Sequence, residues 1–228
     1  MIFSTKPNHQ ETICGCLYLI VDFLILPSLL SVINTLLPSP LSSVTLNVLY
    51  YFINFALILL IFRKYLLQAV KDALRVPFIT VVYAVLTFLG NMALSHILTL
   101  VLSTLFPGFS NINDLKVSTM LQANFPIMAA GIVLLVPLAE ETLFRGLIFR
   151  GLYDRSPVAA YLVSMTAFAT IHVMGYFVLF DPLFVLLNFL QYLPAGYCLC
   201  FAYHRSGTII SPILMHMIVN AVAVYSMR

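Results

Sequence analysis

Charged residues are scarce in this chain of 228 residues: Asp, Glu, Lys and Arg together make up 8% of it, whereas 62% is hydrophobic. With a mean hydropathy of +1.04, no soluble domain of this length could hide so much apolar surface. The apolar runs are long and uniform rather than short and alternating, which excludes membrane-spanning strands. The sequence therefore predicts an all-α fold, a polytopic transmembrane helical bundle.

Two other residue types are rare or missing. Tryptophan is absent, so an aromatic belt at the membrane interfaces must use the 12 tyrosines. The cysteines form two close pairs inside apolar runs, Cys14-x-Cys16 and Cys198-x-Cys200. This spacing is too tight for an easy disulfide and lacks the companions of a zinc site, so we interpret the cysteines as small apolar residues. The formal net charge is only +3, and we expect no nucleic-acid partner.

About seven apolar segments are candidates for membrane spans, within one predicted domain of residues 1–228. Residues 63–75 are predicted to be a basic, mildly amphipathic connector on the membrane surface. Residues 107–123 are predicted to be the longest polar loop, and Pro194-Ala-Gly196 is expected to interrupt the sixth span. The predicted spans cover approximately residues 13–37, 44–62, 78–105, 126–150, 157–180, 182–203 and 208–226.

The distribution of Lys and Arg predicts a cytoplasmic N-terminus. Seven spans place the two termini on opposite sides, and basic residues in short loops mark the cytoplasmic side. On the outer side only Lys116 and Arg228 would remain. The segments on the N-terminal side carry Lys6, Arg63, Lys64, Lys71, Arg75, Arg150, Arg155 and Arg205.

Ionisable side chains lie deep within several predicted spans. At about 1.5 Å per residue, Glu140 lies roughly 15 Å from the cytoplasmic end of its span, His172 roughly 22 Å and His216 roughly 12 Å from the ends of theirs. All three then lie near the middle of the membrane, where an ionisable group costs several kcal/mol and indicates a functional site. Asp22, in the first span, is expected to be paired or close to an interface.

Helical spacing assigns partners to these groups. Glu141 and Arg145 are four residues apart and can form an ion pair on one helix face. Glu140 is turned away from Glu141 by about 100°, which leaves it as a free carboxylate. The same four-residue spacing separates Phe168 from His172 and His216 from Asn220. The sequence therefore predicts an active site inside the membrane.

Two carboxylates, two histidines and an amide at one depth can support hydrolysis. A carboxylate can act as general base, one histidine can share the water, and a second histidine with an asparagine can stabilise an oxyanion. The same groups allow a divalent metal such as zinc, bound by Glu140, His172 and His216 with an open position for water. Two other readings are helix-to-helix hydrogen bonding without catalysis and a proton relay. The residues alone leave these alternatives open.

Three short motifs resemble those of the CPBP family (CAAX protease and bacteriocin-processing, also called Abi), which includes the type II CAAX prenyl endopeptidases. The first, E-E-x-x-x-R, matches residues 140–145, the second, F-x-x-x-H, residues 168–172, and the third, H-x-x-x-N, residues 216–220. Each motif alone is weak, but their order within a membrane protein is specific. The resemblance covers residues 125–225, and the first three spans offer nothing specific.

The resemblance implies an intramembrane endopeptidase that acts on a membrane-associated peptide or a membrane-anchored protein. By this resemblance, Glu140 and His172 activate water, and His216 and Asn220 stabilise the oxyanion. Glu141, Arg145 and Phe168 would support the site, and no cofactor is expected, with zinc as the alternative.

The compact chain resembles prokaryotic members of the family, so we expect it in the plasma membrane and in contact with the lipid bilayer. The competing function is a non-catalytic immunity or scaffold protein that binds a peptide such as a bacteriocin in the same cavity. The sequence does not indicate the substrate, the cleavage site or the oligomeric state.

Overall fold

Long apolar helices make up most of the chain in the computed structural model, which describes residues 3 and 5–228. Within these residues, six helices are long and apolar enough to cross a membrane, and no strand occurs. The predicted polytopic helical bundle is therefore confirmed, and the chain is an integral membrane protein. The seventh predicted span is a shorter helix of 17 residues.

The elements follow one another with short connections. They are α1 (His9–Ile20), η1 (Val21–Ile25), α2 (Leu26–Thr35), α3 (Ser43–Ile61), α4 (Arg63–Arg75), α5 (Pro77–Leu105), α6 (Ile112–Ala123), α7 (Phe125–Ala130), η2 (Gly131–Leu135), α8 (Val136–Glu141), η3 (Thr142–Phe149), α9 (Arg150–Tyr153), α10 (Pro157–Val173), η4 (Met174–Tyr176), α11 (Pro182–Ser206) and α12 (Ile210–Ser226).

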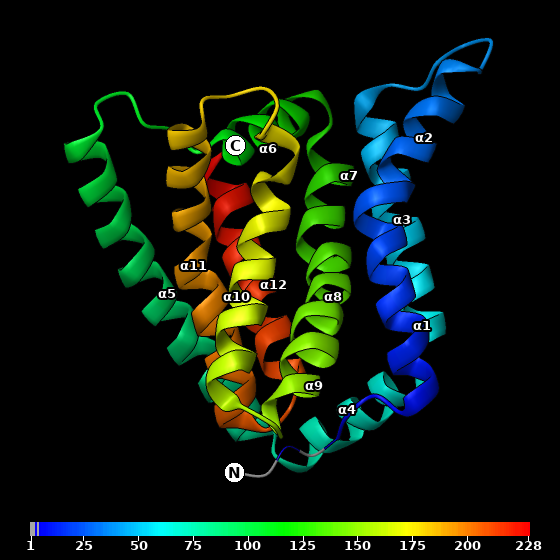
Figure 1. The fold of residues 1–228 in the computed structure, drawn as a ribbon, viewed down its shortest axis with the longest axis vertical. Coiled ribbons are helices and arrows are strands. Elements are labelled where there is room, and N and C mark those ends of the chain that lie inside the picture. The colour runs from blue at the N-terminus through cyan, green and yellow to red at the C-terminus, as the bar shows by residue number, and fades with distance from the viewer. Residues whose placement is uncertain (1–2, 4) are drawn as a thin grey trace.

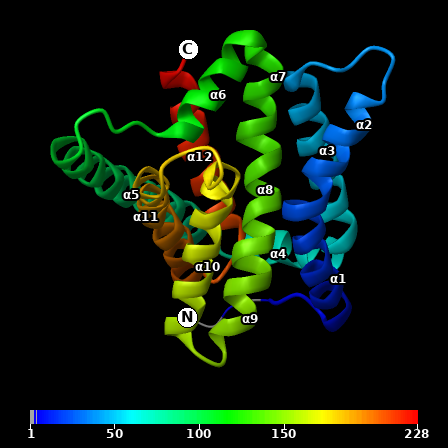
Figure 2. The same ribbon diagram turned by 45° about the horizontal axis from the view of Figure 1, so that its top comes forward.

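The long helices run side by side between two ends of the molecule (Figure 1). One end holds the N-terminal segment, α4 and the turn between α9 and α10, and we call it the α4 end. The opposite end holds α6, the connection between α2 and α3, and the C-terminus (Figures 1 and 2). We call it the α6 end. Helices α1 to α3, with the π segment η1, form an N-terminal hairpin of residues 9–61 that stands beside α7 and α8.

Side-chain caps and prolines fix several helix ends. The Ser156 side chain accepts a hydrogen bond from the Ala159 N–H, and the following Pro157 occupies the first turn of α10. Such a proline loses nothing, because the first N–H groups of a helix have no intrahelical partner. Asp181 caps α11 in the same way, ahead of Pro182. These starts agree with the boundaries predicted from the sequence.

Two local predictions are wrong. Most of the predicted polar loop of residues 107–123 is the 12-residue helix α6, whose N-terminus is capped by the Asn111 side chain. Helix α11 is not interrupted at Pro194 but runs through it. In both places packing against the bundle outweighs local propensity.

The first and fourth spans each contain a π-helical segment directly ahead of a proline. Segment η1 precedes Pro27, and η2 precedes Pro137, each with one residue between. A proline inside an α-helix lacks an N–H and clashes with the carbonyl four residues earlier, so the wider π turn accommodates it. A third π segment, η3, follows Glu141. Glu140 and Glu141 thus end a short α-helical stretch between two π segments.

A cluster of buried aromatic side chains closes the bundle toward the α4 end. Phe62 and Tyr65 from the hairpin side pack with Phe149 and Tyr203 from the second half of the chain. Gly146 permits this contact, because a Cβ there would lie 2.9 Å from the Tyr65 ring.

Candidate active site

The four residues predicted to be catalytic line one cavity of about 920 Å³: Glu140, His172, His216 and Asn220. They come from three helices, α8, α10 and α12, which are distant in sequence. The cavity lies between these helices and the N-terminal hairpin, and α6 contributes Asn113, Asp114 and Lys116 to its wall. It therefore reaches from the motif residues toward the α6 end.

Glu140 presents a carboxylate oxygen that no group in the described part of the chain satisfies. Its side chain is half-buried on the cavity wall. The oxygen Oε2 is inaccessible to solvent and has no hydrogen-bond partner among the described residues. A buried carboxylate without a partner is costly in a structural role, which makes Glu140 the group available for chemistry.

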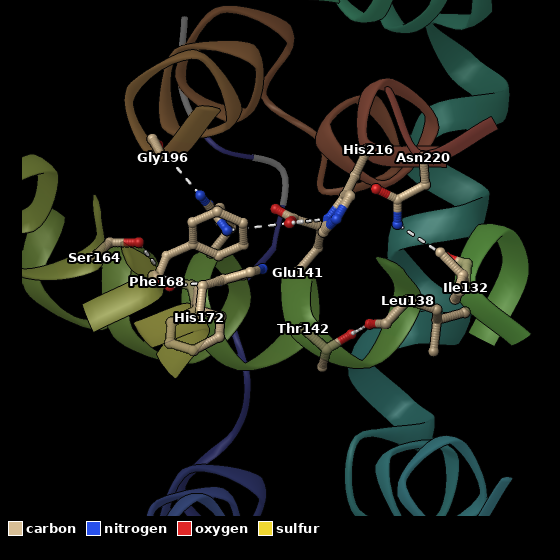
Figure 3. A network of polar contacts seen from close by, with 12 residues as sticks. Ile132, Leu138, Glu141, Thr142, Ser164, Phe168, His172, Gly196, His216 and Asn220 are labelled. Atoms are coloured by element: carbon tan, nitrogen blue, oxygen red, sulfur yellow. Dashed lines mark hydrogen bonds and ion pairs between the residues drawn. The ribbon is translucent and has the colours of Figure 1, made fainter. Parts of the chain in front are cut away.

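Glu141 lies at the centre of a different, fully buried set of contacts (Figure 3). Its Oε1 accepts a hydrogen bond from Arg145 Nη1 at 3.0 Å, which is the predicted ion pair. The same oxygen contacts His216 Nδ1 at 2.8 Å. Because a carboxylate oxygen accepts, Nδ1 of His216 must carry its proton. The contact to His216 was not predicted, since helical spacing reveals only neighbours on one helix.

Arg145 is enclosed by groups from three helices. Besides Glu141, it donates from Nη2 to the carbonyl oxygen of Gly196 at 3.2 Å. Its guanidinium lies 4.4 Å from the centre of the Phe168 ring, a cation–π contact that is strong where water is excluded. Phe168 thus supports the site by covering this charge. Arg145 itself has no exposed surface.

His172 is oriented by its own helix. Its Nδ1 lies 2.8 Å from the Phe168 carbonyl oxygen, and a carbonyl only accepts, so Nδ1 is the donor. In the neutral ring the other nitrogen, Nε2, is then an acceptor. The ring also stacks on Tyr192, with centroids 4.2 Å apart. The F-x-x-x-H spacing therefore delivers a histidine with one nitrogen fixed and the other free to take a proton.

Asn220 bonds a backbone carbonyl that a proline leaves free. Its Nδ2 donates to the Ile132 oxygen at 2.8 Å (Figure 3). In η2 the Val136 N–H bonds the carbonyl five residues back, that of Gly131. The next bond of this series would join the Pro137 nitrogen to Ile132, but proline has no N–H. Asn220 supplies the missing donor, which sequence reasoning did not predict.

The N-terminal hairpin forms the opposite wall of the cavity and holds a buried acid of its own. Asp22 has no exposed surface, and its carboxylate accepts hydrogen bonds from Tyr50 Oη at 3.0 Å and Asn54 Nδ2 at 3.1 Å. Asn54 in turn accepts from Tyr18 Oη at 3.0 Å. The prediction that Asp22 is paired is confirmed, with neutral donors instead of a cation. Tyr50 and Asn54 line the cavity.

Charged residues stand where the cavity approaches the α6 end. Asp114 is exposed as a whole, but partial desolvation against the cavity wall raises the pKa of its carboxyl to about 6, so its charge develops between acidic and neutral pH. Lys116 lines the same region. The cavity wall is mixed, and the segments that carry Glu140 and His172 add the apolar side chains of Ile132, Leu135, Val136, Ala139 and Ile171.

The alternative metal site does not fit this arrangement. Among the described residues, no three His, Cys, Asp or Glu side chains are grouped as metal ligands would be. The side chains that the alternative requires are Glu140, His172 and His216, and they do not form such a group. The absence of a metal requirement stays a prediction.

Comparison with known proteins returned one match. Residues 122–222 match the model of a family described as Rce1-like, type II CAAX prenyl endopeptidase Rce1-like. Neither the curated proteins nor the solved structures gave a match. The matched segment contains all three motifs and excludes the N-terminal hairpin. The match over residues 122–222 agrees with the family that the motifs predicted.

Proposed function

We propose that the protein is an intramembrane endopeptidase of the CAAX-protease type, in which Glu140 and His172 activate water against a peptide bond. The family match supports a peptidase. The observation that carries the mechanism is the meeting of four motif residues on one cavity, with a Glu140 oxygen left unpartnered there.

The reaction begins with water between Glu140 and His172. Glu140 accepts a proton from the water, while the unprotonated Nε2 of His172 holds the second hydrogen and orients the oxygen. The oxygen attacks the substrate carbonyl carbon, and the carbonyl becomes a tetrahedral oxyanion. The proton on Glu140 then passes to the leaving amine as the carbon–nitrogen bond breaks, which restores the carboxylate.

The oxyanion is stabilised by His216 and Asn220. A His216 ring that carries both protons holds one N–H against Glu141 and directs the other into the cavity. Asn220 keeps its second amide hydrogen for the oxyanion, because only one is engaged by Ile132. With His216 in this form, the charges of Glu140, Glu141, Arg145 and His216 sum to zero, which suits a site at membrane depth.

The substrate class that we propose is a membrane-associated peptide or a membrane-anchored protein. The wall near Glu140 offers apolar side chains for an apolar substrate segment, and the volume lies within the range of ligand sites. The family description names a CAAX prenyl endopeptidase, so a prenyl group is the first substrate modification to test.

The decisive experiment compares Glu140→Gln with the wild type in cells and in purified form. The variant keeps the size and shape of Glu140, but it replaces one carboxylate oxygen by an amide nitrogen and cannot take a proton. We expect new protein termini in the membrane proteome of wild-type cells only, and a loss of peptide hydrolysis of at least about a hundredfold. His172→Gln should act in the same direction.

A matched control is His96→Gln, a histidine on α5 that is exposed and does not line the cavity. It should retain full activity. If Glu140→Gln cleaves as fast as the wild type, the glutamate mechanism is wrong. If the same variant still protects cells in an immunity assay, a binding function replaces the peptidase. Activity that disappears on chelation and returns with added zinc would overturn the metal-free mechanism.

For orientation, we propose that the α4 end faces the cytoplasm, because the basic residues other than Arg145, Lys116 and Arg228 gather there. The cavity then approaches the outer surface of a prokaryotic plasma membrane. In a background without the native cysteines, a membrane-impermeant thiol reagent on intact cells should label Lys116→Cys and spare Lys71→Cys. The reverse pattern would invert the assignment.

A further inference from the structure

The cavity has two walls of different origin, and only one of them carries the catalytic motifs. The matched segment of residues 122–222 supplies Glu140, His172, His216 and Asn220. The N-terminal hairpin, which lies outside that segment, supplies Tyr50, Tyr51 and Asn54. A substrate that reaches Glu140 therefore lies against the hairpin. The polar side chains of the hairpin can contact this substrate without being part of the catalytic motifs.

The hydrogen bonds in the hairpin have a defined direction. Tyr18 donates to Asn54, Asn54 donates to Asp22, and Tyr50 donates to the other oxygen of Asp22. Asp22 is the common acceptor, lies behind the cavity wall and has no exposed surface. Because Tyr50 spends its only hydrogen on Asp22, its oxygen can only accept from a group inside the cavity.

We propose that the Tyr50 hydroxyl oxygen binds a backbone N–H of an extended substrate peptide and that Asp22 is the positioning residue that fixes its orientation. This inference rests on the proposed peptidase function and names a contact that the motifs do not supply. The peptide lies between the hairpin and α8, with its scissile carbonyl toward Glu140. A peptide N–H is the donor that every substrate residue except proline carries, so the contact sets register and not side-chain preference.

The hairpin provides its own control. Tyr18 belongs to the same hydrogen-bonded set as Tyr50 and donates to it from the other end, but it does not line the cavity. A role confined to joining α1, η1 and α3 requires both hydroxyls alike. A role in substrate binding requires the Tyr50 hydroxyl alone. Replacing each tyrosine by phenylalanine removes one oxygen and keeps the ring in place.

The experiment measures peptide binding to full-length protein that carries Glu140→Gln, so that no cleavage occurs. The probes are a fluorescent CAAX-type peptide with a farnesyl group and the same peptide without it. Adding Tyr50→Phe should weaken binding about five- to tenfold, as the loss of one hydrogen bond does. Tyr18→Phe should change binding less than twofold. In the otherwise wild-type enzyme, Tyr50→Phe should raise KM and leave kcat within about twofold.

Two further measurements locate the contact. Asp22→Asn places an amide that can donate to the Tyr50 oxygen, and it should weaken binding as Tyr50→Phe does. In a series of peptides, each amide is replaced in turn by an ester, which removes one N–H. At one position the replacement should weaken binding to the Glu140→Gln parent, but it should not weaken binding to the same protein with Tyr50→Phe.

The outcomes separate this inference from the proposed function. If the wild type fails to cleave peptides, but Tyr50→Phe weakens their binding and Tyr18→Phe does not, the binding role of Tyr50 is supported and the peptidase mechanism is wrong. If Glu140→Gln protein binds neither probe, the inference is overturned. It is equally overturned if Tyr50→Phe binds as tightly as its parent, or if Tyr18→Phe loses as much affinity.

Discussion

Two π-helical segments of the same kind, η1 and η2, lie close to acidic residues whose surroundings differ. In the N-terminal hairpin, η1 precedes Pro27 and contains Asp22, and in the fourth span η2 precedes Pro137 and leads to Glu140 and Glu141. Asp22 is satisfied by neutral donors from α3. Glu141 is satisfied by Arg145 and His216, and Glu140 has no hydrogen-bond partner within the part of the chain that the structure describes.

The difference shows how a membrane protein can keep carboxylates that stabilise its structure apart from a carboxylate that is available for reaction. Neutral donors satisfy both oxygens of Asp22 without adding another charge to the hairpin. A cation partner commits the carboxylate to its charged form. The hairpin therefore tolerates its acid, while the fourth span confines one fixed charge in Glu141 and keeps a second carboxylate, Glu140, open to the cavity.

The largest expected effect is the loss of either partner of the Glu141–Arg145 pair. Both side chains have no exposed surface, so Arg145→Ala leaves a buried charge without its cation. We expect a loss of about 3–5 kcal/mol of stability, measured as thermal or denaturant unfolding of the purified protein. Asp154→Ala is the control: its partner Arg150 is also four residues away, but Asp154 is half-exposed, so the expected loss is below about 1 kcal/mol.

A smaller effect is expected at Asn220, and it should depend on Pro137. Asn220→Ala removes the donor to the Ile132 carbonyl and should cost about 1–3 kcal/mol. Pro137→Ala restores a backbone N–H beside that carbonyl and should recover much of this stability in the double variant. The oxyanion contact would not return, so activity should stay low. Equal losses from Asn220→Ala with and without Pro137 would contradict this account of the π turn.

A substitution at Gly196 tests whether α11 helps to enclose Arg145. A Cβ at this position would lie 2.9 Å from Met165 Cβ and 3.0 Å from Met165 Cα. Backbone atoms cannot move aside as the tip of a flexible side chain can, so Gly196→Ala should displace the carbonyl that accepts from Arg145. We expect the variant to lose about 1–3 kcal/mol of stability. Gly175→Ala, where nothing lies near the added Cβ, is the matched substitution without that cost. Unfolding of both variants decides the point.

The smallest expected effect is that of Asp22→Asn on stability. The amide keeps one acceptor for Asn54 and can exchange donor and acceptor roles with Tyr50, so the change should stay within about 1 kcal/mol. Asp22→Leu leaves both donors unpaired and should cost more. A large loss from Asp22→Asn would mean that the hairpin, like the fourth span, depends on a fixed charge.

Sequence reasoning reached the parts of this site that are local along the chain. Spacing of four residues predicted the Glu141–Arg145 contact, the long apolar runs predicted the helical bundle, and three ordered motifs predicted the family match over residues 122–222. Sequence reasoning could not predict the contacts between helices. Nothing in the residue order links Asn220 to Ile132, or Tyr50 to Asp22, because these partners are 88 and 28 positions apart. The clue that was available is proline itself, since each missing N–H demands another donor.

The π turn at Gly131–Leu135 also acts as an insertion hidden inside a continuous helix. It fits an extra residue into a turn, so the positions before it are rotated by about 100° relative to a plain α-helix. Deleting Val133 would barely shorten the helix, yet it would turn α7 away from the contacts it now makes and carry Ile132 off Asn220. Relatives that lack the proline and the asparagine together should therefore differ here by a gap of one residue.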